Sequence, residues 1–76
     1  MKYIITEDLG VCVFSNSSVH KDMAYALKVR NSIIGAGFIT VSDDGEVRCH
    51  GESVSLKIKS RGELDAEIIG KQLLGY

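Results

Sequence analysis

Residues with side chains suited to bind a phosphate gather in one segment, residues 45–61 (GEVRCHGESVSLKIKSR). If Gly51 and Glu52 form a two-residue turn, this segment folds into a β-hairpin in which His50 lies opposite Ser53. Because side chains alternate between the two faces of a strand, one face is apolar and carries Val47, Cys49, Val54, Leu56 and Ile58. The other face carries the polar side chains of Glu46, Arg48, His50, Ser53, Ser55, Lys57 and Lys59, and Ser60 and Arg61 follow just past the strand. Cations and hydroxyls on one face are what a phosphate-bearing ligand requires, so the segment predicts a binding surface.

A helix predicted over residues 61–74 begins next to this surface. Ser60 and Glu63 have the spacing of a capping box, and the unpaired N–H groups at a helix N-terminus attract anions. Two interpretations remain open. In one, Ser60 donates to a phosphate oxygen beside Lys57 and Lys59; in the other, it only caps the helix and the lysines keep an exposed strand soluble. The two serines in phase with the cations favour the first interpretation.

The preceding strand, residues 38–42, enlarges the polar surface. A loop of three residues, 43–45, keeps the apolar side chains of the two strands on one face. The apolar pairs in this register are Val41 with Val47 and Ile39 with Cys49. The same register adds Phe38, Thr40 and Ser42 to the polar face.

Aromatic side chains and one imidazole have two open interpretations each. Phe38, together with Tyr25 or Tyr3, would offer a base a stacking surface, although a position in the core is the more common role for each. His50 is either an exposed turn residue or a donor to a phosphate or a base edge. In the second case, binding would strengthen as the pH falls.

The sequence pattern argues against catalysis. Cys49 and His50 are neighbours on a strand and point to opposite faces, so they do not form a nucleophile pair. No two Cys or His residues have the close spacing of a metal site. The paired acids Asp43 and Asp44 are explained by a turn. We therefore expect no enzymatic activity, no metal and no cofactor.

The size and charge of the chain restrict its class and partners. Its 76 residues form one domain, residues 1–76, and a core this small favours a homo-oligomer, a dimer or a tetramer. A net charge of −1 argues against nucleic acid as the partner. No signal sequence or apolar run of membrane-spanning length is visible, which predicts a cytoplasmic protein.

Cys12 and Cys49 fall on apolar strand faces, so we expect reduced thiols, with a disulfide as the alternative.

The remaining elements complete a predicted ββαβββα order. Residues 2–6 and 11–15 are β-rich runs. A helix over residues 19–29 follows, with an inner stripe of Met23, Ala26, Leu27 and the stem of Arg30. In the C-terminal helix the apolar stripe is Leu64, Ile68, Ile69 and Leu73. We expect a two-layer α+β domain in which both helices cover the apolar side of one mainly antiparallel sheet and leave the polar side open.

The stretch SIIGAGF…DGEVRCHGESVSLKIKSR, with its GES-x-SL-x-x-KSR motif, resembles small accessory proteins encoded by phages and prophages. The similar stretch covers residues 32–67. Some of these proteins are nucleotide sponges, which bind cyclic nucleotide immune signals as oligomers and keep them from host antiviral effectors. The resemblance implies a host-cytoplasmic protein whose ligand-binding residues are Arg48, Ser53, Ser55, Lys57, Lys59 and Arg61.

Taken together, these features predict a non-enzymatic protein that sequesters a phosphate-containing small molecule, such as a cyclic dinucleotide. The alternative is a protein–protein interaction module that inhibits a host factor through the exposed sheet face or an edge strand.

Overall fold

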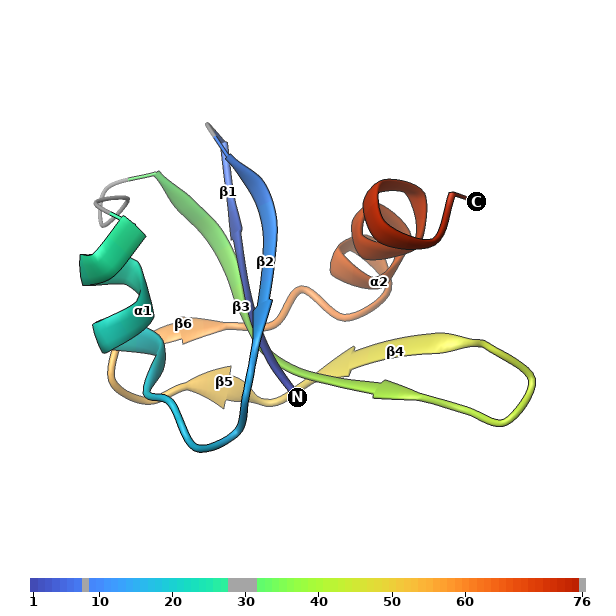
Figure 1. Ribbon diagram of the computed structural model, residues 1–76, viewed down its shortest axis with the longest axis horizontal. Coiled ribbons are helices and arrows are strands. Elements are labelled where there is room, and N and C mark those ends of the chain that lie inside the picture. The colour runs from blue at the N-terminus through green and yellow to red at the C-terminus, as the bar shows by residue number, and fades with distance from the viewer. Residues whose placement is uncertain (8, 28–31, 76) are drawn as a thin grey trace.

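The computed structural model describes residues 1–7, 9–27 and 32–75 (Figure 1). Four antiparallel strands form the main sheet in the order β2-β1-β3-β4. Their bounds are β1 Lys2–Thr6, β2 Gly10–Phe14, β3 Ile33–Val41 and β4 Val47–His50. Two short strands, β5 Glu52–Ser53 and β6 Ile58–Lys59, pair with each other. The helices are α1 His20–Leu27 and α2 Glu63–Ile69, and α2 continues as a π-helical turn, η1 Gly70–Leu74.

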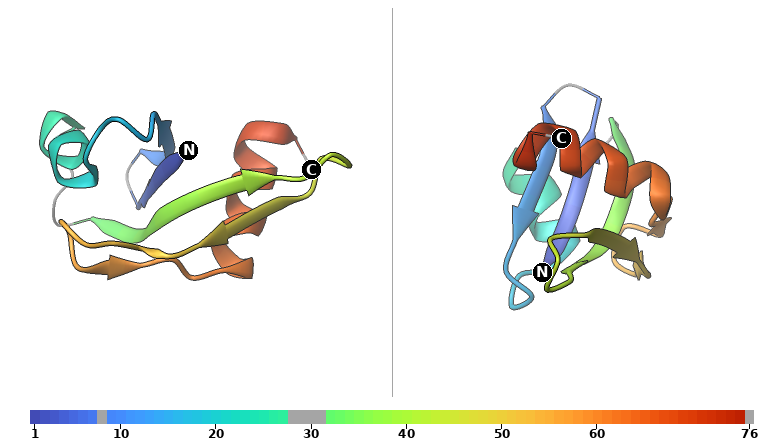
Figure 2. Two further views of the ribbon diagram at one scale, coloured as in Figure 1. Left: turned by 90° about the horizontal axis from the view of Figure 1, so that it is seen from below. Right: turned by 90° about the vertical axis from the view of Figure 1, so that its right-hand side faces the viewer.

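The α+β class and the mainly antiparallel sheet are confirmed. The predicted register between β3 and β4 is also confirmed, because Val41 lies opposite Val47 and Ile39 opposite Cys49. The prediction that both helices cover one face is wrong. α1 and α2 lie on opposite sides of the sheet, as Figure 1 and the left view of Figure 2 show.

Alternation along β1 explains the two covered faces. Tyr3 and Ile5 point to the side where Ile69 of α2 packs. Ile4 points to the other side, where Ala24 of α1 packs. All three β1 residues are at most 1 % exposed, so each face of the central strand has a core of its own.

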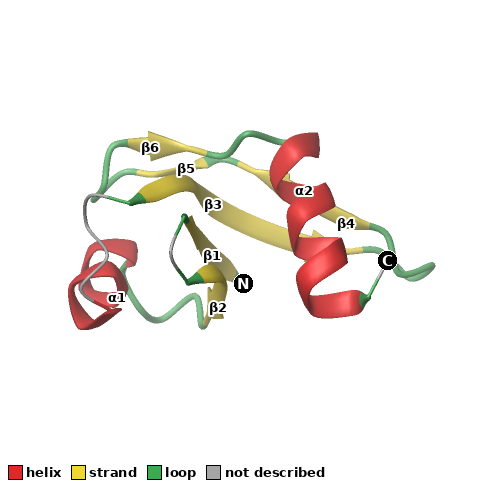
Figure 3. Ribbon diagram, turned by 90° about the horizontal axis from the view of Figure 1, so that it is seen from above, coloured by secondary structure: helices red, strands yellow, loops and turns green. Residues whose placement is uncertain are grey.

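The predicted hairpin over residues 45–61 does not form. β4 pairs with β3, and the chain then turns at Gly51, whose φ is 74°. The hydroxyl of Ser53 accepts the N–H of Leu56 at 3.2 Å, which stabilises a turn where the prediction had a continuous strand. As a result Ser53 pairs with Ile58 instead of His50. β5 and β6 lie along β3 (Figure 3), and Leu56 and Ile58 pack into the core on the α1 side.

The helices also differ in detail from their predicted stripes. In α1, His20 and Ala24 are buried, and Ala26 is exposed. The side chain of Leu27 and residues 28–30 lie outside the described residues. In α2 the stripe is correct for Ile69, which is 2 % exposed, but Leu64 is half exposed. Leu73, in η1, is also half exposed.

α2 crosses the sheet from one edge to the other (Figure 2, right). Its first residues lie beside β4, and Gln72 in η1 accepts the N–H of Val11 in β2 at 3.0 Å. The helix therefore covers the whole width of one face of the sheet.

Candidate functional site

The predicted polar surface is divided among several places in the structure. Phe38 and His50 keep their expected positions on one face of β3 and β4, where their rings stack with centroids 6.1 Å apart and planes 18° apart. Arg48 lies opposite Thr40 on the same face. Its guanidinium is 3.6 Å from the carboxylate of Glu46 and is exposed. This part of the predicted surface is therefore formed and open to solvent.

The two serines of the predicted surface stabilise the fold instead. Ser53 is fully buried, and its hydroxyl holds the turn after β5. The hydroxyl of Ser55 accepts the N–H of Lys21 at 3.1 Å. Lys21 is in the first turn of α1, so Ser55 satisfies a helix N–H group from a distant turn.

The lysines do not converge with the serines. Lys57 is exposed and has a left-handed φ of 59°. Lys59 is exposed and pairs with the acidic Glu52 across the β5–β6 ladder. Val54, predicted in the apolar face, is 78 % exposed. The expected single face of cations and hydroxyls is wrong because it depended on the continuous hairpin.

Ser60 and Arg61 lie in a polar cluster on the α2 side of the sheet. The hydroxyl of Tyr3 is 2.7 Å from Ser60 Oγ and 2.5 Å from Asp65 Oδ2. Tyr3 has only one proton to donate and the carboxylate only accepts, so Tyr3 donates to Asp65 and Ser60 donates to Tyr3. Asp65 also accepts the backbone N–H of Arg61 at 2.9 Å and its Nε–H at 2.7 Å. Burial, and then the hydrogen bond to Asp65, raise the pKa of the Tyr3 phenol.

The capping box predicted at the start of this helix does not form. The N-cap residue is Gly62, with no side-chain cap hydrogen bond. The hydroxyl of Ser60 accepts the N–H of Gly62 at 3.1 Å, outside the first turn. The carboxylate that reaches back from the helix belongs to Asp65, because Glu63 is exposed to solvent.

Sequence reasoning missed the importance of Asp65, which is fully buried. Its signal was present: it is an acid three and four residues before Ile68 and Ile69, within the apolar stripe. It also follows Arg61 by four residues, the spacing of a helical ion pair. Asp65 lies against Gly35 of the sheet, and the sequence gives no sign of this contact. A Cβ at that position would meet Asp65 Oδ2 at 2.5 Å.

A pocket of about 380 Å³ opens beside Phe38. Its lining residues come from β1, the start of α1, β3 and the β5 region: Lys2, Val19, His20, Phe38, Glu52, Val54 and Ser55. The ammonium of Lys2 lies 6.0 Å from the centroid of the Phe38 ring and donates to the carbonyl of Ser18 at 2.6 Å. The pocket thus combines an aromatic ring, a cation, a hydroxyl and a carboxylate.

His20 supports the wall of this pocket. Its ring meets Phe38 edge-on at 5.8 Å and Phe14 at 5.3 Å, and the residue is 4 % exposed. Nε2 is 2.9 Å from the carbonyl oxygen of Gly37, so this nitrogen carries the proton and donates it. Burial lowers the pKa of His20, with a further contribution from the charge of Lys2. His20 is therefore a neutral structural histidine.

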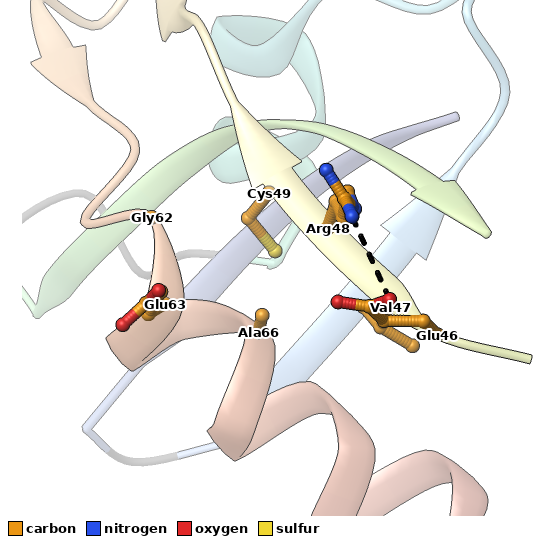
Figure 4. Close-up of a pocket in the computed structure, with 7 residues that line it drawn as sticks. All are labelled: Glu46, Val47, Arg48, Cys49, Gly62, Glu63 and Ala66. Carbon is orange, nitrogen blue, oxygen red and sulfur yellow. Dashed lines mark ion pairs between the residues drawn. The ribbon is translucent and has the colours of Figure 1, made fainter. Parts of the chain in front are cut away.

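A second pocket, of about 340 Å³, lies between β4 and the start of α2. Figure 4 shows its lining: Glu46, Val47, Arg48, Cys49, Gly62, Glu63 and Ala66. The thiol of Cys49 points toward the helix, and burial raises its pKa to about 11. Such a thiol is a poor nucleophile near neutral pH.

Both cysteines are free and lie on opposite faces of the sheet. Cys49 packs against the α2-side core, whereas His50 stacks on Phe38, so the predicted separation of these neighbours is confirmed. Within the described residues, no three His, Cys, Asp or Glu side chains gather as a metal site.

The chain matches no protein-family model, no curated protein sequence and no solved structure. The helices in the described part of the chain are too short or too polar to cross a membrane. The geometry of the two pockets and the open strand face is therefore the basis for assigning a function.

Proposed function

We propose that the protein is a non-enzymatic binding protein for a small molecule that carries a phosphate group and a planar ring, and that the Phe38 pocket is its binding site. The observation that carries the proposal is the ammonium of Lys2, 6.0 Å from the Phe38 ring centroid at the rim of a pocket of about 380 Å³. That volume lies within the usual range for small-molecule sites.

The lining supplies a separate partner for each part of such a ligand. The ammonium of Lys2 has three donors and uses one on Ser18, so it retains donors for a phosphate oxygen. The hydroxyl of Ser55 accepts from Lys21 and lies 3.4 Å from the hydroxyl of Ser53, so when Ser53 is the donor of that pair the Ser55 proton can be donated to a ligand. The apolar side chains of Phe38, Val19 and Val54 provide a surface for a ring.

Glu52 restricts the choice of ligand further. A carboxylate at the rim repels a phosphate but accepts a hydrogen bond from an amino or ring N–H group. A nucleotide whose base carries such donors satisfies both ends of the pocket. Cyclic dinucleotides, the ligand class implied by the resemblance to phage sponge proteins, have this combination of groups.

Isothermal titration calorimetry with a panel of cyclic dinucleotides, linear mononucleotides and inorganic phosphate tests the proposal. We expect saturable binding of at least one nucleotide by the wild-type protein. Phe38→Leu and Lys2→Gln should each weaken binding about tenfold or more, because a stacked base and a charged hydrogen bond each contribute about 1–3 kcal/mol.

Lys57→Gln is the matched control, because it removes an exposed lysine outside the pocket and should leave binding unchanged. If no nucleotide binds at high micromolar concentration, or if Lys57→Gln weakens binding as much as Lys2→Gln, the proposed site is wrong.

A further inference from the structure

The outer edge of β4 presents backbone groups that are free to pair. Ile39 of β3 donates its N–H to Met1 at 2.8 Å, and its carbonyl accepts from the Met1 ammonium at 3.4 Å. Both backbone groups of Ile39 therefore point toward β1, away from β4. Cys49 lies opposite Ile39, so its own N–H and C=O point away from β3. The same holds for Val47, two residues earlier on the strand.

The two edges of the main sheet differ in their protection. At the β2 edge, the side chain of Gln72 covers the strand and accepts the N–H of Val11. β4 is the other terminal strand. Just past its end, the N–H of Ser60 bonds the carbonyl of Gly51 at 3.0 Å, so residues 60–62 lie near the Cys49 end of this edge, but within residues 1–7, 9–27 and 32–75 no hydrogen bond reaches the outer backbone groups of Val47. β4 also carries no proline, no lysine and no bulge, so of the usual devices against pairing with another chain it has its short length and the charge of Arg48.

We propose that β4 pairs in antiparallel fashion with β4 of a second copy of this chain, about a two-fold axis at Val47. In this register Val47 lies opposite the partner's Val47 and exchanges two hydrogen bonds with it. Glu46 lies opposite the partner's Arg48, and Arg48 lies opposite the partner's Glu46. The two sheets join into one continuous sheet of eight strands.

Charge complementarity selects this register. Glu46, just before β4, and Arg48 already attract each other within one chain at 3.6 Å, and both side chains are more than half exposed. An axis at Val47 adds two opposite-charge pairs across the interface. An axis at Arg48 instead places two arginines directly opposite each other, which is unfavourable.

The apolar side chains support the same register. Val41 lies opposite Val47 and is 60 % exposed at the end of the β3–β4 hairpin. With the axis at Val47, the valines of the two copies form one row of four on the same face, in the order Val41, Val47, the partner's Val47 and the partner's Val41. Val47, which is half-buried in one copy, thereby gains the partner's Val47 as an apolar neighbour on its open side.

The helix on this face leaves the edge accessible. α2 begins beside β4 at Gly62 and Glu63 and ends beside β2 at Gln72, so it runs away from the proposed axis. In Figure 1 the β3–β4 hairpin extends away from the strands β1 and β2. The dimer surface is separate from the Phe38 pocket, so this inference does not depend on the proposed ligand.

Sedimentation equilibrium of the wild-type protein and charge-reversal variants tests the register. We expect a reversible wild-type dimer. Glu46→Arg and Arg48→Glu should each raise the dissociation constant about tenfold or more, because each turns two attractive pairs into repulsive ones. An equimolar mixture of the two variants should associate more tightly than either one alone. The double variant Glu46→Arg/Arg48→Glu should restore the wild-type constant.

Val41→Lys provides a matched control for the same arrangement. Val41 lies one strand away from the interface and far from the partner's Val41, so the added cation should change the dissociation constant much less than the charge reversals do, and urea unfolding of each variant verifies its fold. The inference is overturned if the wild-type protein is monomeric at millimolar concentration. It is also overturned if the single reversals leave the dissociation constant unchanged, or if the double variant fails to restore it.

Discussion

The hydroxyl of Tyr3 lies 2.5 Å from Oδ2 of Asp65 and joins the first strand to the last helix. Both residues are fully buried. A buried carboxylate is costly unless its oxygens are hydrogen-bonded. Tyr3 supplies one donor, and Arg61 supplies a backbone and a side-chain donor. This cluster fixes where α2 begins on the sheet, and with it the wall of the pocket beside β4.

Removal of the tyrosine hydroxyl should lower the stability of the fold. Tyr3→Phe leaves a buried carboxylate with one donor fewer, and we expect the free energy of unfolding in urea to fall by about 1–3 kcal/mol. Glu67→Gln is the control in the same helix. It breaks only the exposed ion pair with Lys71, so it should cost less than about 1 kcal/mol. Equal losses in the two variants would contradict the role of the buried cluster.

Gly35 is required by the carboxylate that lies against it. In Gly35→Ala, the new Cβ would meet the two oxygens of Asp65 at 2.5 and 2.8 Å, and we expect a loss of about 1–3 kcal/mol from overpacking. A double-mutant cycle with Asp65→Ala checks the cause. In the Asp65→Ala background, the same glycine substitution should cost much less. A cost that does not depend on residue 65 would show that strain elsewhere is responsible.

We expect the side chain of Arg61 to stabilise the fold. Its side chain is about one-third exposed and pairs with the fully buried Asp65 at 2.7 Å. Arg61→Glu brings a second carboxylate toward Asp65, and even with solvent screening we expect a loss of about 2 kcal/mol or more in urea unfolding. Lys57→Glu changes the charge of an exposed turn and should leave the stability within about 0.5 kcal/mol of wild type. Similar stabilities for the two variants would be inconsistent with this assignment.

Stability should decrease in acid partly through His20. Its folded-state pKa is lowered from the ordinary value of 6.5, chiefly by burial. As the pH falls below about 6.5, the unfolded chain binds a proton at His20 before the folded chain does. The free energy of unfolding therefore declines through that window. His20→Gln can still donate to Gly37 but does not titrate, so its stability should fall less between pH 7 and pH 5. Parallel pH profiles would exclude the effect.

Ser55 should stabilise α1 although it lies outside that helix. Ser55→Ala removes the acceptor of the Lys21 N–H, and we expect a loss of about 0.5–2 kcal/mol, as for other lost helix caps. Hydrogen exchange should accelerate at Lys21 more than in β1. Ser17→Ala is the control, because within the described part of the chain the Ser17 hydroxyl hydrogen-bonds only the hydroxyl of the neighbouring Ser15. An unchanged exchange rate at Lys21 would argue against the cap.

The parts of the structure that the sequence predicted correctly depend on the alternation of side chains between the two faces of a strand. The register of Val41 with Val47 and the opposite orientations of Cys49 and His50 follow from the two-residue period of a strand and the length of one loop. The α+β class follows in the same way from the order of strand-like and helix-like runs. These features depend on residues close together in the chain.

Only the tertiary structure decided which surface each of the polar residues reaches. Ser53 supports a turn, Ser55 caps a helix 34 residues away, and Asp65 meets Tyr3 across 62 residues. The continuous hairpin does not form because the hydroxyl of Ser53 accepts the nearby N–H of Leu56 and stabilises a turn. The alternation of polar and apolar residues along a strand does not reveal that this local hydrogen bond competes with strand pairing. Burial and long-range hydrogen bonds depend on which elements pack together, and a single sequence specifies that packing only through the energy of the whole fold.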